Sequence, residues 1–312
     1  MLAPTAARTV RCMATPHKSP AQRARSAGND ARARLLSGLP VAERRLHLAG
    51  VSTAVLEGGD GPPMVLLAAE FAAVWVRVIP DLVATHRVIA PDLPGLGASE
   101  VTDGPIDVDD ALAWLAELID STCTVNPVLV GKGAAGGLAA RFAIDHGDHL
   151  DHLVLVDGYG LDRFRPSPAM AMTFVSVLLR PTDRGLQRSF RKYCYVDLDR
   201  VRAEMGESYD WLSAYALDRF RTSSVRAAIR GLLAQLSASI PAQELGRITV
   251  PTTLIWGRQD VGMRLSVAEA ASRRYGWPLQ VIEHARDDPA VEQPGAFVAA
   301  LRTALRDDGG RS

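Results

Sequence analysis

The sequence predicts an α/β fold, in which a mostly parallel eight-stranded sheet is flanked by helices and carries an inserted helical cap. From residue 43 onward, short runs rich in β-branched residues alternate with stretches of helical periodicity. One long helical stretch, residues 161–245, interrupts this alternation between two expected strands. The 312 residues are 47% hydrophobic and 22% charged, the balance of a globular chain. This length suits one large α/β domain with an insertion.

The expected strands are short apolar or alternating runs separated by turn signals. Clusters of Gly and Pro at residues 58–63 and 91–95 end two of them, and Asn126-Pro127 opens another. The eight expected strands cover residues 44–49, 52–57, 63–69, 86–91, 126–131, 151–157, 251–257 and 278–283. Helical periodicity between or after the strands predicts helices at residues 108–121, 134–146, 266–275 and 293–306.

The same pattern divides the chain into a core, a cap and two ends. Residues 31–160 and 246–306 form the expected core, and residues 161–245, rich in Arg and aromatic residues, form the cap. Residues 1–30 carry five basic residues and no acid before the last position, so we expect a disordered basic arm, with an organelle-targeting segment as the alternative. Residues 307–312 form a short tail.

Charge and cysteine content indicate the kind of partner. The 35 basic and 35 acidic residues cancel, so no net field draws the chain to nucleic acid or to an anionic membrane. No apolar run reaches the roughly 18 residues that a membrane span needs. The three cysteines show no paired spacing, which fits a reducing cytoplasm. We expect a cytoplasmic protein that binds a small apolar or polyfunctional organic molecule; its oligomeric state stays open.

Three segments in this order carry a family resemblance. Residues 86–99 read HRVIAPDLPGLGAS, residues 253–260 read TLIWGRQD, and residues 292–294 read EQP. They resemble the fourth strand and its loop, the acid-bearing turn after the seventh strand, and the start of the last helix of the α/β-hydrolase superfamily. The resemblance covers residues 43–306 and is closest to the cap-bearing branch of epoxide hydrolases and esterases. It implies a triad acid at Asp260.

The other two positions of the implied catalytic triad carry residues that differ from the family's serine and histidine. The family's G-x-S-x-G elbow, which exposes a nucleophilic serine above the sheet, aligns with residues 131–135, where Gly133 stands in place of the serine. The segment that should carry the general base, residues 286–294, has Asp287 in place of the histidine. A Ser-His-Asp mechanism is therefore not expected.

The loop after the third strand also departs from the family. There the His-Gly pair that helps to form an oxyanion hole is missing, and the strand runs into Ala69 and Glu70 before Trp75. With Gly133 and Ala134 at the elbow, these residues are expected to line a substrate pocket with an apolar chamber. His284 is a further candidate, either as a reorganised base or as an exposed residue at a strand end.

New charged residues gather where the triad is lost. Lys132 and Asp287 are expected beside Asp260, with Asp288 and Glu70 nearby. Lys132 would act as an acid or hold an anionic substrate, or it would pair with Asp287 or Asp260 and fill the vacated space. Burial under a cap would raise the pKa of Asp287 toward a working range, which makes it the candidate base, assisted by Lys132 or Asp260.

Two other motifs admit a different interpretation. Residues 131–136 also fit G-x-G-x-x-G, with Asp157 after the next strand, as in dinucleotide sites, but the motif follows the fifth strand rather than the first. His146, His149 and His152 could suggest a metal, yet their spacing with interleaved aspartates is typical of a solvated surface loop. We therefore expect neither a cofactor nor a metal.

The sequence thus predicts an enzyme of the α/β-hydrolase fold without a serine nucleophile or a triad histidine. Cyclisation, elimination or isomerisation in a biosynthetic pathway is the expected chemistry, by acid–base or template catalysis. A ligand-binding pseudoenzyme is the first alternative. Hydrolysis by activated water, with Asp287 or His284 as base, is the second.

Overall fold

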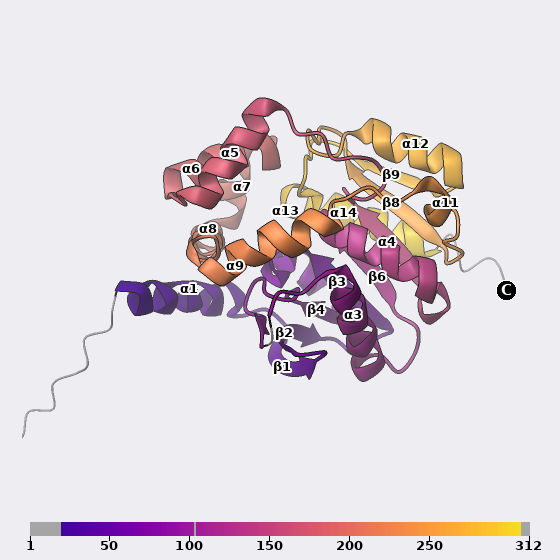
Figure 1. Cartoon of the computed structure of the whole chain (residues 1–312), viewed down its shortest axis with the longest axis horizontal. Helices are drawn as coiled ribbons and strands as arrows, with labels where there is room; N and C mark the ends of the chain where they lie inside the picture. The colour runs from indigo at the N-terminus through magenta and orange to yellow at the C-terminus, as the bar shows by residue number, and fades with distance from the viewer. Residues whose placement is uncertain (1–19, 103, 307–312) are drawn as a thin grey trace, which may run out of the picture.

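The computed structural model describes residues 20–102 and 104–306 and contains one nine-stranded sheet (Figure 1). Its strand order is β1-β2-β4-β3-β6-β7-β8-β9, and the short β5 pairs with β2. The strands are β1 (Ala42–Leu48), β2 (Val51–Gly58), β3 (Pro63–Ala68), β4 (Arg87–Pro91), β5 (Glu100–Val101), β6 (Val128–Lys132), β7 (His152–Val156), β8 (Thr252–Gly257) and β9 (Leu279–Ile282).

The sheet confirms the predicted fold class. Pairs from β4 through β3, β6, β7 and β8 to β9 are parallel, whereas β2 pairs antiparallel with β1, β4 and β5. All eight expected strands are present. Within the described residues the structure has one strand more than the eight expected. The additional strand is β5, which is two residues long and pairs Val101 with Val51 and Glu100 with Ser52. Two residues carry no periodicity from which a strand could be predicted.

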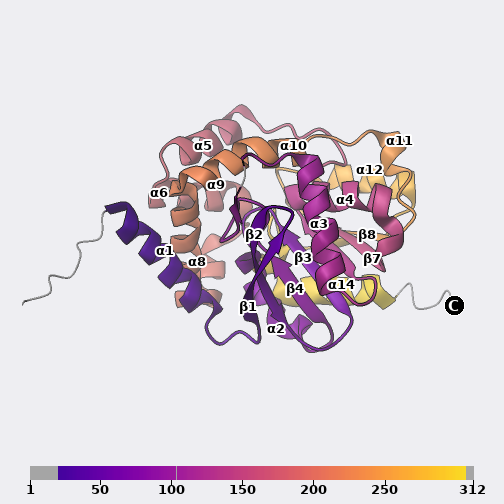
Figure 2. The same ribbon diagram turned by 60° about the horizontal axis from the view of Figure 1, so that its bottom comes forward.

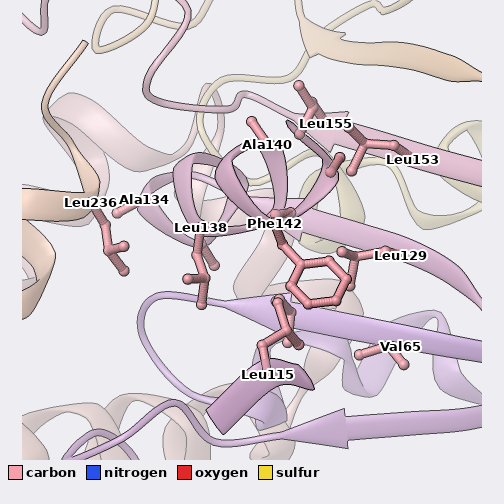
Figure 3. Close-up of a cluster of buried hydrophobic side chains, with 14 of the residues drawn as sticks. Val65, Leu115, Leu129, Ala134, Leu138, Ala140, Phe142, Leu153, Leu155 and Leu236 are labelled. Atoms are coloured by element: carbon pink, nitrogen blue, oxygen red, sulfur yellow. The ribbon is translucent and has the colours of Figure 1, made fainter. Parts of the chain in front are cut away.

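The central strands are buried on both faces, which explains their continuous apolar sequences. Successive residues of β6 serve opposite cores: Leu129 packs in one and Val130 in the other. Figure 3 shows the first core, where Phe142 lies among Leu115, Leu129 and Leu138. Helices α3 (Val108–Thr122), α4 (Ala134–His146) and α12 (Leu265–Tyr275) contribute to this core, and α14 (Pro294–Arg306) covers the other face.

The cap lies between β7 and β8 and is entirely helical apart from its loops. Figure 1 shows α5 to α7 as a group set apart from the sheet. The elements are α5 (Pro168–Leu179), α6 (Asp183–Ser189), η3 (Phe190–Cys194), α7 (Leu198–Met205), α8 (Glu207–Arg221), α9 (Ser223–Ala228), η4 (Ile229–Leu233), α10 (Ala234–Leu236) and α11 (Ala242–Leu245). The short remaining helices are η1 (Ala72–Arg77), α2 (Ile79–Leu82), η2 (Gly147–His149) and α13 (Pro289–Glu292).

The N-terminal region corrects one prediction. Helix α1 (Pro20–Leu36) begins inside the stretch expected to be a disordered arm, and it runs beside cap helix α8 (Figure 2). Its Ala and Arg residues are strong helix formers. Tertiary contacts hold it, because Ala31 and Leu35 are buried and Arg32 reaches both the core and α8. Residues 1–19 of the expected arm and the tail 307–312 lie outside the described residues.

In the part of the chain that the structure describes, no helix combines the length and the apolar character needed to cross a bilayer.

Candidate active site

A cavity of about 620 Å³ lies between the carboxyl ends of the central strands and the cap. From the core it is lined by Ala69, Glu70, Gly133 and Ala134, all expected pocket residues, and by Asp287 of the loop after β9. Cap residues supply most of the apolar wall: Phe164, Phe174, Val177, Leu178, Leu186, Phe190, Leu212, Phe220, Ile229 and Leu233. The apolar wall with a few polar groups at one end has the character of a small-molecule site.

Two expected pocket residues lie elsewhere. Trp75 is fully buried in the core below, where its ring packs against Phe297 at 5.8 Å between centroids. A large apolar side chain in the helical turn after β3 is drawn into the core rather than toward the cavity. His284 is exposed on the loop after β9, away from the cavity wall, and its carbonyl accepts a hydrogen bond from Gln293. Neither residue contributes to the cavity.

The turn between β6 and α4 keeps the shape of a nucleophile elbow without a nucleophile. Gly133 has φ 56° and ψ −128°, a conformation that a side chain adopts only under strain. Its N–H donates to the carbonyl of Val156, and its own carbonyl accepts from Gly136 and Tyr159. A Cβ added at Gly133 would meet no atom within 4 Å. The position therefore opens onto the cavity but holds no group that could attack a substrate.

Packing accounts for the other glycines of the G-x-G-x-x-G motif. A Cβ on Gly131 would lie 2.8 Å from the Cβ of Ala139 and from the Cα of Gly136. A Cβ on Gly136 would lie 2.9 Å from the Cα of Gly158. The close approach of β6, α4 and the end of β7 therefore requires these glycines without any bound dinucleotide.

Lys132 is the most enclosed charged residue of the site. Its side chain is 0% exposed, and its Nζ lies 2.9 Å from Glu70 Oε1, 3.3 Å from Asp288 Oδ1 and 3.8 Å from Asp287 Oδ2. Burial alone lowers the pKa of Lys132, but the nearby carboxylates raise it well above its usual value. Lys132 therefore stays charged as the centre of an ion-pair cluster. The sequence predicts Asp287 or Asp260 as the ion-pair partner of Lys132, and the structure shows the pair with Asp287.

The buried aspartates Asp260, Asp287 and Asp288 hold their protons more tightly than usual. Burial raises the pKa of Asp288 to about 7, against the opposing charge of Lys132. Burial also raises the pKa of Asp287. Asp260 has a pKa of about 7 because of burial and the nearby Asp287 charge, although its carboxylate accepts the N–H groups of Gly262 at 2.7 Å and Met263 at 3.2 Å. These two hydrogen bonds give Asp260 a structural role in its turn.

Asp157 is a residue of the site that the sequence analysis used only for the dinucleotide alternative. It follows β7, is fully buried, and has φ 44°. Its Oδ1 accepts the N–H of Gly257 at 2.9 Å, and burial together with the Asp260 charge raises its pKa well above the usual value. The available signal was its position at the carboxyl end of a central strand, where α/β proteins bind ligands.

The loop that carries Asp287 and Asp288 is fixed to the cap on both sides. Arg286 Nη1 donates to the carbonyls of Lys192 at 2.9 Å and Tyr195 at 3.0 Å. The Glu292 carboxylate accepts the N–H of Val196 at 2.5 Å and that of Arg286 at 2.6 Å. The two carboxyl groups are therefore held in place by contacts with cap residues 192–196.

The three clustered histidines do not form a metal centre. His146 and His149 approach each other edge to face, with 6.0 Å between ring centroids. His152 is buried, contrary to the expected surface loop, and bonds to Thr253 Oγ1 at 3.0 Å because it already belongs to β7. Across residues 20–102 and 104–306, no group of three or more His, Cys, Asp or Glu side chains is arranged to hold a metal ion.

Fold and site together define an α/β protein with a cap-covered pocket at the carboxyl end of its sheet. A comparison with protein families identifies the class more closely. The family model described as alpha/beta hydrolase fold matches residues 62–287. The chain belongs to this family.

Two curated relatives align with most of the chain. It is 26% identical over 259 residues to the pimeloyl-[acyl-carrier protein] methyl ester esterase of Aeromonas salmonicida (strain A449), covering 81% of this chain and 98% of that protein. It is 24% identical over 278 residues to the 2-hydroxy-6-oxo-6-(2'-aminophenyl)hexa-2,4-dienoic acid hydrolase of Metapseudomonas resinovorans, covering 84% and 90%. Relatives of this chain are thus enzymes named as esterases and hydrolases.

Solved structures share the fold. A 2-hydroxy-6-oxo-6-phenylhexa-2,4-dienoate hydrolase from Rhodococcus sp. strain RHA1 superposes with a TM-score of 0.72 at 21% identity, covering 85% of this chain and 99% of that chain. A bacterial membrane phospholipase A superposes with a TM-score of 0.74 at 21% identity, covering 92% and 93%. At these identities the likeness shows the fold alone.

Proposed function

We propose that this protein binds a small organic molecule under its cap and converts it by noncovalent acid–base chemistry, with Asp287 as the base. The observation that carries the proposal is the pairing of an elbow without a nucleophile, Gly133, with a cavity of about 620 Å³ that still reaches the carboxyl groups. An ester or carbon chain could lie in this cavity, as the names of the relatives suggest, but no serine at the elbow could attack it.

Asp287 and Asp288 form the proposed acid–base pair. Both line the cavity and both lie within 4 Å of Lys132 Nζ. Neighbouring carboxyl groups in a buried site share protons, so one accepts a proton while the other still holds one. Asp287 would take a proton from a carbon or hydroxyl of the ligand, and Asp288, with a pKa of about 7, would return one at another atom. The ligand is thereby rearranged without a covalent intermediate.

Lys132 has a supporting role in this scheme. It is absent from the cavity wall, because Glu70, Asp287 and Asp288 lie between its ammonium group and the space above. Direct proton transfer from Lys132 to a ligand is therefore not part of the proposal. The residue instead limits how far the pKa values of its neighbours rise, since each of its ion pairs favours the ionised carboxylate.

Cyclisation or isomerisation suits this arrangement best. The apolar cap wall would hold the body of a flexible ligand in a folded conformation, which lowers the entropic barrier to ring closure. A proton removed by Asp287 and a proton supplied by Asp288 leave the composition of the ligand unchanged. In an elimination, the Asp288 proton would leave with the departing group instead.

The test begins with a search for a ligand that copurifies with the protein. We would identify it by native mass spectrometry, incubate it with fresh protein and follow its mass and retention time. A rearranged product of unchanged mass supports the proposal, as does loss of a neutral leaving group. Asp287→Asn should slow this conversion at least about 100-fold, the usual contribution of a positioned base, and leave the fold intact.

Glu283→Gln is the matched control, since it makes the same change on an exposed residue of the same loop. It should leave the rate unchanged. A product heavier by one water would instead identify hydrolysis by activated water. Ligand recovered unchanged after long incubation would identify a binding protein, the function that the complete Lys132 ion-pair cluster favours as the second candidate.

A further inference from the structure

The floor of the cavity holds more acid than base. Lys132 is the cation in contact with Glu70, Asp287 and Asp288, and two further buried carboxyl groups, Asp157 and Asp260, lie close enough to influence the same groups. One ammonium group cannot neutralise this set. In the free protein, burial raises the pKa of Asp260, Asp287 and Asp288, so these groups hold protons more tightly and bound protons relieve part of the imbalance.

This end of the cavity also has fewer hydrogen-bond donors than its acceptors need. In the described part of the chain, Glu70 Oε2 is enclosed and accepts no hydrogen bond, and the same holds for Asp157 Oδ2, whose residue is buried and does not line the cavity. Asp288 is 6% exposed, lines the cavity, and its Oδ1 has an ion pair with Lys132 but no hydrogen bond of good geometry. Buried acceptors without donors cost free energy, so a ligand that donates here gains affinity.

We propose that the ligand of this cavity is an organic cation, a protonated amine carried by an apolar body. The ammonium group would lie against Glu70 and Asp287, which both approach the same Lys132 nitrogen, and the body would lie against the cap wall. This inference rests on the proposed function only in using the same cavity. It adds the charge of the substrate, which the acid–base chemistry itself leaves open.

The cavity offers an anionic ligand a poorer fit. Two arginines belong to its wall, Arg163 and Arg219. Arg219 is already paired with Asp218 and donates to the carbonyl of Gly97 at 2.9 Å. Arg163 is exposed on the segment that enters the cap, so it could hold a carboxylate only at the cap side. A carboxylate at the floor would add one more negative charge beside Asp287.

Binding of an amine should release protons. The groups that surround Asp287 electrostatically are Lys132, Glu70, Asp157, Tyr159, Cys194, Asp260 and Asp288. A second cation among them favours ionised carboxylates, so carboxyl protons leave as the amine enters. Affinity should therefore rise from pH 5 to pH 8, the interval in which Asp260 and Asp288, each with a pKa of about 7, lose their protons.

The experiment compares three ligands with one body: 4-phenylbutylamine, 4-phenylbutan-1-ol and 4-phenylbutyrate. Isothermal titration at pH 7.5 should give the amine at least about a tenfold advantage over the alcohol, as expected for a buried hydrogen bond to a charged group, with the acid weakest. Titration of the amine in two buffers of different ionisation enthalpy should show net proton release. An acid that binds as tightly as the amine would overturn the inference.

Variants show whether the floor is responsible. Glu70→Gln should lower amine affinity about tenfold and change alcohol affinity less than twofold, whereas Glu283→Gln should change neither. An unaltered ratio of amine to alcohol affinity in Glu70→Gln would refute the assignment. The alcohol separates the two proposals: if none of the three ligands binds, the proposed function fails, but if the alcohol or acid is preferred, only the charge assignment fails.

Discussion

Two buried charge clusters in this protein are built in opposite ways. In the first, Arg32 of α1 lies 3.1 Å from Asp92, and the Asp92 carboxylate also accepts the N–H groups of Ala72 at 2.6 Å and Ala98 at 2.7 Å. Among the buried groups, one cation thus faces one well-bonded carboxylate. The exposed Glu43 pairs with the same guanidinium at 3.2 Å, and the Tyr215 hydroxyl of the cap accepts a hydrogen bond from it at 3.1 Å. In the second, Lys132 faces several carboxyl groups beside an open cavity.

We interpret the Arg32–Asp92 cluster as structural and the Lys132 cluster as part of the proposed functional site. The Arg32–Asp92 cluster joins α1, the loop after β4 and the cap, and its bonding leaves little for a ligand to add. The Lys132 cluster holds more carboxyl groups than cations, and its members Glu70, Asp287 and Asp288 line the cavity. Loss of one member strongly destabilises a buried ion pair, because it leaves an uncompensated charge. In a cluster with more carboxyl groups than cations, removal of one carboxyl group relieves like-charge repulsion.

The largest expected effect comes from breaking the balanced pair. Arg32→Met leaves the Asp92 carboxylate, 0% exposed, without its cation and should lower the free energy of unfolding by about 3–5 kcal/mol. Urea denaturation at pH 7 measures it. Arg34→Met, at an exposed position of the same helix, should change stability by less than about 0.5 kcal/mol. Equal effects of the two variants would contradict a specific role for the Arg32–Asp92 pair.

An opposite sign is expected in the unbalanced cluster. The pKa of Asp288 is about 7 in the native state and about 3.9 in the unfolded chain. Between these values the native state binds more protons, so this residue lowers the free energy of unfolding as pH rises from 4 to 7. Asp288→Asn should therefore stabilise the protein at pH 8, by at most about 4 kcal/mol for a shift of about three pKa units, and have no such benefit near pH 4.

The measurement is chemical denaturation of both proteins across this pH range. Glu283→Gln serves as the control, because its carboxylate is 58% exposed and pairs with Arg258 at the surface. A stability difference between wild type and Asp288→Asn that stays constant with pH would show that Asp288 titrates normally. The two clusters would then differ in composition only.

The sequence predicted the sheet well because its signals are local. Alternation along β6 and β7 and the turn residues around them depend on neighbours a few positions away. The assignment of Gly133 and Asp287 to triad positions rests on the motif resemblance and stays a prediction. Helix α1 was missed because its stability comes from partners far along the chain, Asp92 and Tyr215, which no local composition reveals.

The geometry of the candidate site could be predicted only in part. Lys132 and Glu70 are 62 positions apart, and Asp288 is farther still, so their meeting at one nitrogen follows from the parallel order of β3, β6 and the strands beyond. Trp75 was placed in the pocket from its position after β3, but a single helical turn decides whether such a side chain faces the core. Asp157 had no motif of its own.

The smallest expected effect concerns the backbone beside the unbalanced cluster. Gly133→Ala places a Cβ in open space, so steric contact costs nothing, but φ 56° should lower the free energy of unfolding by about 1–2 kcal/mol. Gly295→Ala, in helix α14 and equally free of contacts, should instead stabilise by about 0.5–1 kcal/mol. Thermal unfolding of both variants measures the contrast. Opposite signs would show that the turn at Gly133 has strained backbone geometry, and matching signs would show a relaxed turn. A strained turn at Gly133 fits a cavity wall that is shaped for a ligand, because a relaxed turn would not require glycine at this position.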